Sequence, residues 1–260
     1  MSPKNTKRLE QCLPDGQLVN RAWLKEQGFN RPRVDYALRA GKLVALRHGI
    51  YRRPGPLLKW EHVVFSLNEM GYAVHVGGRS ALEMQGLAHY LPLGETQRIG
   101  LYSTGKIPGW TRIFSDSFKF EIHNKQLFEE LPKPGLSTRT FGSWDWSIPF
   151  STPELALLEL LADVRDTADF SIADKFFEGA VNLRPNLLGE LLTRCKQVKA
   201  KRLFLWFSDR HDHSWRKELE TKSIDLGRGK RMLVKGGIFD TAYQITIPKQ
   251  MVKENENSLF

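Results

Sequence analysis

The sequence predicts an α+β protein, with an N-terminal winged helix-turn-helix followed by a larger mixed α+β domain. Three observations support this prediction: two short helix patterns joined at a glycine, a strand pair directly after them, and positive charge concentrated over the same residues. At 260 residues the chain is long enough for two domains. We place them at residues 1–56 and 57–260, because Pro54-Gly55-Pro56 is a turn signal at which the excess of positive charge ends.

Two helices joined by a tight turn form the first half of the predicted DNA-binding unit. The first covers residues 20 to 27, after an earlier short helix over residues 3 to 12. Gly28 ends it, because glycine takes the left-handed conformation that a helix end needs. The second covers residues 30 to 40, with an asparagine as its cap and Pro32 in the first turn, where a missing N–H group costs nothing.

The second helix has one apolar and one polar side. Val34, Ala37 and Leu38 fall at helical spacing on the apolar side, which we expect to pack inward. Strand-like residues 43 to 46 and 50 to 51 follow, with a turn between them. In a winged helix-turn-helix, this helix enters the major groove of DNA and the strand pair forms the wing against the backbone.

Positively charged and hydrogen-bonding side chains occupy the polar side of this helix and the wing. Arginine bonds guanine edges or pairs with phosphate, and tyrosine reaches a phosphate or a base edge. A small helical domain with a solvated basic face, or a protein-binding module of similar shape, gives the same pattern. We favour DNA binding, because helix order, glycine positions, wing and charge agree. The candidate DNA-binding residues are Asn30, Arg31, Arg33, Tyr36, Arg39, Arg47, His48, Arg52 and Arg53.

The charge distribution supports a nucleic-acid partner. Residues 1 to 55 hold twelve Lys or Arg and four Asp or Glu, a net charge of +8. The whole chain carries +10, so the rest of the chain supplies only +2. A local excess of this kind is typical of the electrostatic footprint of a nucleic-acid-binding surface.

Cysteine content and hydropathy indicate a cytoplasmic protein. Cys12 and Cys195 have neither zinc nor redox spacing, and we interpret them as reduced, buried thiols. No apolar run is long enough to span a membrane, and the polar N-terminus lacks the apolar stretch of a signal peptide. We therefore predict a soluble cytoplasmic protein without a membrane partner.

The rest of the chain alternates helical and strand patterns, as expected for helices with a mainly antiparallel sheet. Ser80 is the candidate cap of one helix. Ser151 or Thr152 caps another, in which Glu154 serves the first turn or a capping box. The expected helices cover residues 59–70, 79–85, 153–164, 171–181, 185–195 and 199–209, and the expected strands cover residues 74–76, 98–102, 118–122 and 243–248.

No catalytic or metal site is visible in the sequence. His211-Asp212-His213 is the one local metal-like cluster, but no third or fourth ligand has a convincing spacing, so we interpret it as a surface loop. The acids between residues 163 and 178 are not arranged as a two-metal site, and we interpret them as a solvated helix surface. We predict no enzyme activity, no cofactor and no bound metal.

A second basic region lies near the C-terminus. Residues 227 to 231 read Gly-Arg-Gly-Lys-Arg, but they lack the Walker A spacing, and no helix follows to receive a phosphate. A solvated basic turn and a phosphate or RNA contact are both open at this point. The residues of this candidate second basic surface are Arg228, Lys230, Arg231 and Lys235.

Four segments, taken in order, carry a family resemblance. They are the winged unit at 17–55, AVHVGGRSALEMQGL at 73–87, STPELALLELLADV at 151–164 and KGGIFDTAYQITIP at 235–248. Together they resemble the AbiEi antitoxins, which belong to the abortive-infection AbiE type IV toxin–antitoxin modules of bacterial phage defence. No single segment identifies the family. The resemblance is specific because the segments occur in this order, with the winged unit preceding a larger α+β domain.

The resemblance implies a protein with two tasks. In that family the winged helix binds inverted repeats in the promoter of its own operon and represses it. The C-terminal domain neutralises a co-encoded nucleotidyltransferase-like toxin, with or without direct contact. The recognition helix would fall on residues 30 to 40 and the wing on residues 43 to 53. A DNA-targeted nuclease, a stand-alone winged-helix regulator and a protein-interaction scaffold are the alternatives.

Overall fold

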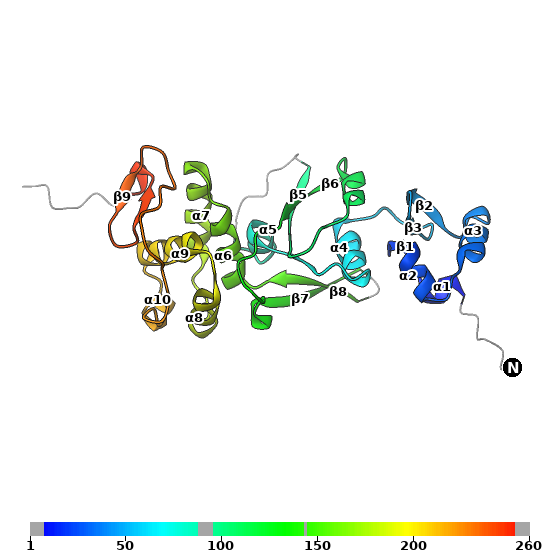
Figure 1. Ribbon diagram of the computed structural model, residues 1–260, viewed down its shortest axis with the longest axis horizontal. Helices are drawn as coiled ribbons and strands as arrows, with labels where there is room; N and C mark the ends of the chain where they lie inside the picture. Colours follow the sequence, from blue (N-terminus) through cyan, green and yellow to red (C-terminus); the bar gives the residue numbers. More distant parts are fainter. Residues whose placement is uncertain (1–7, 88–95, 143–144, 253–260) are drawn as a thin grey trace, which may run out of the picture. The chain divides into compact units, whose positions relative to one another are not determined.

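The computed structural model describes residues 8–87, 96–142 and 145–252 (Figure 1). Helices and β-sheets are both present, which confirms the mixed α+β class. Residues 3 to 7 of the predicted first helix lie outside the described residues. In the part of the chain that is described, no helix combines the length and the apolar character needed to cross a membrane.

The chain forms two compact units. Unit 1 comprises residues 1–76, 94–125 and 138–149, and unit 2 comprises residues 77–93, 126–137 and 150–260. The domain limit near residue 56 stays a prediction.

The N-terminal part of unit 1 contains short helices and a small antiparallel sheet with the strand order β1-β3-β2. Leu24, Val34 and Leu43 are buried in the hydrophobic core that these elements share. The boundaries of α2, α3 and the two hairpin strands agree with the predicted ones to within one residue. The elements are α1 (Leu9–Cys12), β1 (Val19–Asn20), α2 (Arg21–Glu26), α3 (Arg31–Arg39), β2 (Val44–Arg47) and β3 (Ile50–Arg52).

Asparagine residues cap both α2 and α3. The Asn20 side chain accepts the Trp23 N–H at 2.8 Å, and the Asn30 side chain accepts the Arg33 N–H at 3.2 Å. Gly28 lies between the two helices with φ +84°, a conformation that favours glycine. The Asn30 side chain therefore has a structural role at the start of α3.

A five-stranded sheet follows, with the strand order β6-β5-β4-β8-β7. The expectation of a mainly antiparallel sheet needs one correction. Strands β4 and β5 are antiparallel, but β5 and β6 run parallel, with Ile99 opposite Phe120. Parallel neighbours need a long crossover, which residues 104–117 supply. The elements are α4 (Trp60–Glu69), β4 (Val74–Val76), β5 (Gln97–Ser103), η1 (Gly109–Phe114), β6 (Phe118–His123), β7 (Leu136–Phe141) and β8 (Trp146–Ser151).

Unit 2 is mainly helical, and its helix α6 packs against α5, α7, α8 and α9. Phe177 of α7 and Phe207 of α9 are fully buried and stack with ring centroids 5.0 Å apart. Cys195 is buried as predicted, whereas Cys12 of unit 1 is only partly buried. The elements are α5 (Gly78–Met84), η2 (Lys133–Gly135), α6 (Pro153–Asp163), α7 (Thr167–Gly179), α8 (Pro185–Arg194), α9 (Val198–His211), α10 (Ser214–Glu218), β9 (Ile238–Asp240), β10 (Ile245–Ile247) and η3 (Lys249–Met251).

The predicted cap of α5 is wrong. This helix begins at Gly78, so Ser80 lies inside it and is buried. The Gly78 N–H donates to the buried carboxylate of Glu159 at 2.8 Å. A side chain from α6 therefore satisfies the start of α5, an arrangement that local sequence patterns cannot reveal.

The prediction for the start of α6 is correct in part, because Glu154 lies in the first turn after Thr152, but there is no capping box. Thr152 is the N-cap by position, but its side chain makes no cap hydrogen bond. Glu154 is 1% exposed and accepts hydrogen bonds from Arg184 through both carboxylate oxygens at 2.9 Å. Burying a carboxylate without a charged partner costs more free energy than leaving a helix end without a side-chain cap, so Glu154 bonds Arg184. Burial raises the pKa of Glu154, and the bonds from Arg184 outweigh it, so the pKa lies below its ordinary value.

Candidate nucleic-acid interface

The exposed face of α3 is centred on Tyr36 and Arg39. Val34 and Ala37 are buried on the opposite side of the helix, and a turn of 3.6 residues places Tyr36 and Arg39 away from them. The Tyr36 side chain is 61% exposed. Arg39 is exposed, with only a long hydrogen bond of 3.4 Å from its Nε to the Asp35 carbonyl. These two side chains are the best placed on α3 to reach a ligand.

Arg31 and Asp35 lie at one edge of this face. The Arg31 side chain is 82% exposed, and its Nε lies 3.8 Å from the Asp35 carboxylate. The other carboxylate oxygen lies 3.6 Å from a guanidinium nitrogen of Arg21, whose Nε donates to the Tyr51 hydroxyl at 2.8 Å. The bond to Tyr51 raises the pKa of Arg21, and the charge of Asp35 adds to the increase. Arg21 was not among the predicted site residues.

Arg33, at the other edge, is held within the fold. Its guanidinium carbon lies 4.3 Å from the centroid of the Phe29 ring, and a terminal nitrogen donates to the Gly28 carbonyl at 3.0 Å. Arg33 and Tyr36 also line a groove of about 550 Å³ next to α1. The contacts of Arg33 hold the connection between α2 and α3.

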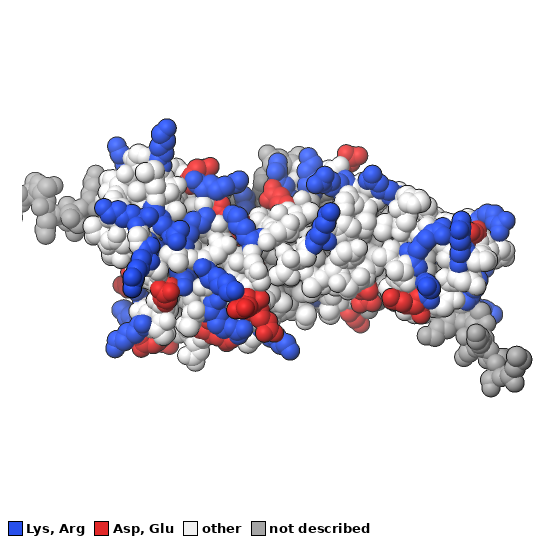
Figure 2. All heavy atoms as spheres, viewed as in Figure 1, with Lys and Arg blue, Asp and Glu red and all other residues white. Residues whose placement is uncertain are grey.

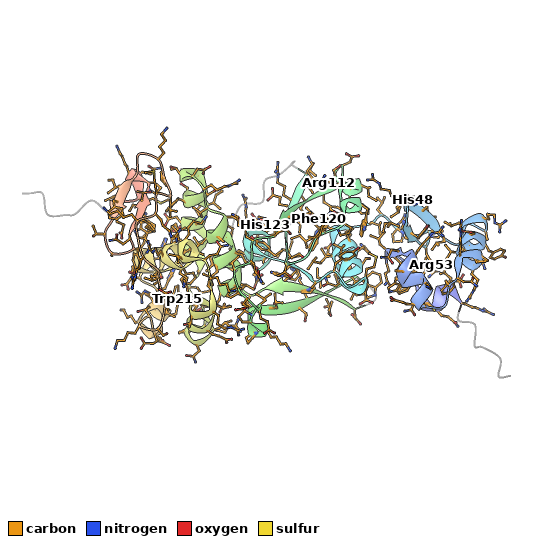
Figure 3. The ribbon with its side chains drawn as sticks, viewed as in Figure 1. His48, Arg53, Arg112, Phe120, His123 and Trp215 are labelled. Carbon is orange, nitrogen blue, oxygen red and sulfur yellow. The ribbon has the colours of Figure 1, made fainter. Side chains whose placement is uncertain are left out.

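The four predicted residues of the hairpin form two pairs that differ in exposure and contacts. Arg47 and His48 are exposed at the turn, and His48 is labelled in Figure 3. Arg52 donates to the Pro56 carbonyl at 2.7 Å. Arg53 donates to the Leu13 carbonyl at 3.2 Å and lies 3.0 Å from the Asp15 carboxylate. Arg52 and Arg53 therefore fix the segment after β3, while Arg47 and His48 are available at the surface.

Lys and Arg side chains gather over α3 and the hairpin on the face in view (Figure 2). Apart from Asn30, which is exposed but caps α3 with its side chain, the exposed members of the predicted set are Arg31, Tyr36, Arg39, Arg47 and His48. These side chains and Arg21 all lie in the N-terminal part of unit 1. The other four predicted residues hydrogen-bond backbone groups of the same chain, and they are Asn30, Arg33, Arg52 and Arg53.

The second basic surface, Arg228, Lys230, Arg231 and Lys235, is exposed in unit 2. The turn that carries this surface is hydrogen-bonded by Arg202, a residue of α9 that is 2% exposed. The Arg202 guanidinium donates to the carbonyls of residues 226, 227, 229 and 244 at 2.7 to 3.2 Å. Burial lowers the pKa of Arg202, and the positive charge of Arg231 lowers it further.

The histidines that were predicted to lie in a surface loop are partly buried contacts between helices. His211 is the last residue of α9, and its Nε2 lies 2.7 Å from a carboxylate oxygen of Asp174 on α7. His213 Nε2 lies 2.6 Å from the Phe177 carbonyl. No group of three or more His, Cys, Asp or Glu among the described residues is arranged to hold a metal ion.

Two family models match the chain. The model described as "Transcriptional regulator, AbiEi antitoxin N-terminal domain" matches residues 2–93, and the model described as "Transcriptional regulator, AbiEi antitoxin, Type IV TA system" matches residues 96–248. The chain belongs to the AbiEi antitoxin family. It is thus a transcriptional regulator of a type IV toxin–antitoxin system, and the family predicted from the sequence is confirmed.

Other comparisons add little to this assignment. No curated protein matches the chain. A crystal structure of the RV2827C protein from Mycobacterium tuberculosis is similar to this antitoxin, with 15% sequence identity and a TM-score of 0.49. The match covers 88% of this chain and 85% of that protein. At this TM-score the likeness supports no conclusion about function.

Proposed function

We propose that this antitoxin represses its own operon by binding inverted repeats in the promoter, through a winged helix-turn-helix formed by α2, α3 and the β2–β3 hairpin. The observation that supports this most directly is the exposed face of α3, on which Tyr36 and Arg39 lie opposite the buried Val34 and Ala37. This face of α3 lies within residues 1–55, which carry +8 of the chain's net charge of +10.

In this proposal the exposed and the anchored side chains have different tasks. Arg31, Tyr36 and Arg39 contact base edges and phosphates in the major groove. Arg47 and His48 contact the backbone or the minor groove from the turn of the wing. The residues held within the fold set the position of these groups rather than touching DNA themselves, and they are Asn30, Arg33, Arg52 and Arg53.

Inverted repeats require two protomers or two binding events. The half-sites are then separated by whole helical turns of about 10 base pairs. Phosphate contacts position the protein and make the affinity fall steeply with salt. We place this activity in the cytoplasm, where promoter DNA is accessible.

We further propose that the C-terminal domain neutralises a co-encoded nucleotidyltransferase-like toxin. The support is the family model named for the antitoxin, which matches residues 96–248. The basic turn at 228–235 is the candidate surface for this task, because Arg202 holds it in one conformation and its cations are exposed. Direct contact with the toxin and action on the toxin's target are both compatible with this role.

The test is binding of the purified full chain to the DNA upstream of its own gene, compared with scrambled DNA of equal length at near-physiological salt. We expect the upstream DNA to bind about 1,000-fold more tightly or better, as sequence-specific regulators do. Equal affinity for the two DNAs would overturn the proposal, because charge alone would then explain the binding. A salt series on both DNAs separates phosphate contacts from base contacts.

A further inference from the structure

We propose that Asp35 determines the DNA specificity of α3 by forming ion pairs with Arg21 and Arg31 at the edge of the recognition face. This inference rests on the proposed DNA binding and names a specificity-determining residue that touches no base. Asp35 is the one acid of α3, in a segment that otherwise favours positive charge.

A chain of four side chains connects the hairpin to α3. Tyr51 of β3 is 4% exposed and therefore fixed in the core. Its hydroxyl accepts the Arg21 Nε–H at 2.8 Å, and the Arg21 guanidinium also lies 5.8 Å from the Tyr51 ring centroid. Arg21 reaches one Asp35 oxygen at 3.6 Å, and Arg31 lies 3.8 Å from the other. Two ion pairs and one hydrogen bond thus connect Arg31 to the hairpin through Asp35 and Arg21.

These ion pairs are poor candidates for a role in folding stability. The side chains of Arg21, Asp35 and Arg31 are 48%, 42% and 82% exposed. Ion pairs at such exposure contribute little to stability, because water screens them and two long side chains lose freedom. A purpose other than folding accounts better for an acid that faces a DNA-binding surface.

Pairing with Asp35 has opposite effects on non-specific and specific binding. A guanidinium held by a carboxylate gains less from a phosphate at an arbitrary position, and the carboxylate itself repels phosphates, so binding to scrambled DNA weakens. At a matching site, an arginine already held in place loses less conformational freedom when it bonds a guanine edge. The ratio of the two affinities therefore depends on Asp35.

The experiment compares Asp35→Asn with Glu26→Gln on upstream and scrambled DNA. Glu26 is an exposed acid at the end of α2, so its replacement removes the same charge from the same unit. We expect Asp35→Asn to bind scrambled DNA more tightly and to lower the affinity ratio about fivefold or more. Glu26→Gln should change both affinities by the same factor and leave the ratio as it is.

A third variant tests the chain of contacts itself. Tyr51→Phe keeps the ring but removes the oxygen that accepts the Arg21 hydrogen bond. We expect Tyr51→Phe to lower the ratio of upstream to scrambled affinity as Asp35→Asn does, but by a smaller factor. An unchanged melting temperature of Asp35→Asn would show that this variant is still folded. A large wild-type ratio that Asp35→Asn leaves intact would overturn this inference alone. A wild-type ratio near one would overturn the proposed function as well.

Discussion

The two basic regions of this antitoxin use arginine in opposite ways. Around α3, arginines lie at the surface with a local partner: the exposed Arg31 is paired with Asp35, and the half-buried Arg33 lies over the Phe29 ring. In the turn at 228–235 the exposed cations are carried by a loop that a buried arginine, Arg202, holds in place. The same residue type thus lies exposed on a helix surface in one region and is a buried structural centre in the other.

This difference shows why a count of positive charges does not define a binding surface. Four of the nine predicted DNA-binding residues, Asn30, Arg33, Arg52 and Arg53, bond within the fold. Arg21 and Arg202 were not among the predicted site residues, and Arg202 was expected in a solvated basic run, yet Arg21 bonds Tyr51 and the buried Arg202 bonds the turn at 226–229. Substitutions that distinguish a structural cation or carboxylate from a ligand-facing one can therefore test the contrast between the two regions.

The largest effect is expected from Arg202→Met. This change removes a buried guanidinium and leaves four partly buried carbonyls without their charged donor, which costs about 3–5 kcal/mol of unfolding free energy. Chemical denaturation followed by circular dichroism measures it. The control is Arg228→Met in the same turn, which removes an exposed cation and should change stability by less than about 0.5 kcal/mol. Equal effects of the two variants would show that the turn does not depend on Arg202.

The next effect separates Arg39 from Arg33 on α3. Arg39→Ala removes an exposed group of the recognition face, and we expect upstream DNA to bind about 10- to 100-fold more weakly, with stability nearly unchanged. Arg33→Ala removes the contacts to Phe29 and the Gly28 carbonyl, so about 1 kcal/mol of unfolding free energy should be lost. Fluorescence anisotropy and thermal melts measure the two quantities. The reverse pattern would contradict the division into exposed and anchored arginines.

Two glycines with similar backbone angles provide a finer comparison of the regions. Gly41 after α3 has φ +66° with open space around it, whereas Gly227 has φ +63°, and a Cβ atom added there would lie 2.8 Å from Val198 Cγ2. Gly41→Ala should cost about 1 kcal/mol for the left-handed backbone alone. Gly227→Ala should cost roughly 1 kcal/mol more, because Val198 must also move. Thermal melts of both variants measure the difference, and combining Gly227→Ala with Val198→Ala should remove the excess if the contact causes it.

The positions of α2, α3 and the β2–β3 hairpin followed from local chemistry. Asn30, Gly28 and the apolar spacing of Val34 and Ala37 all act within a few residues of their own helix, so the sequence sufficed to place α3. Strands β1, β7 and β9 and helix α10 were not predicted. Residues 238–240 form a strand by pairing with β10, and the Trp215 indole of α10 is fixed by the Ala180 carbonyl.

The errors at the candidate sites have one physical cause. Glu159, Glu154 and His211 each bond a group far away in the chain, namely Gly78, Arg184 and Asp174. Spacing rules describe neighbours along the chain, whereas burial makes a polar group bond whichever partner the fold brings near. The composition of α3 could therefore be predicted, but the surroundings of Arg31 depended on Arg21 and on Tyr51 of the hairpin.

The smallest effect concerns pH and the partly buried carboxylate of Asp174 in unit 2. Burial raises the pKa of Asp174, but the hydrogen bonds from His211 and Arg210 outweigh it, so the pKa in the folded protein lies below its ordinary value of 3.8. A lowered pKa means that the stabilisation is present above pH 3.8 and is lost as pH falls through the folded value. We expect Asp174→Asn to cost about 1 kcal/mol near pH 7 and progressively less below about pH 4.

Urea titrations between about pH 7 and pH 2.5 would measure how the difference in unfolding free energy between wild type and Asp174→Asn decreases as the pH falls. Asp35→Asn is the matched variant from unit 1. The side chain of Asp35 is 42% exposed against 23% for Asp174, so its replacement should change stability by less than about 0.5 kcal/mol at neutral pH. If Asp35→Asn destabilised the protein as much as Asp174→Asn, the ion pairs on α3 would be structural. Asp35 would then resemble the carboxylates of unit 2, and the contrast between ligand-facing and structural charges would not hold.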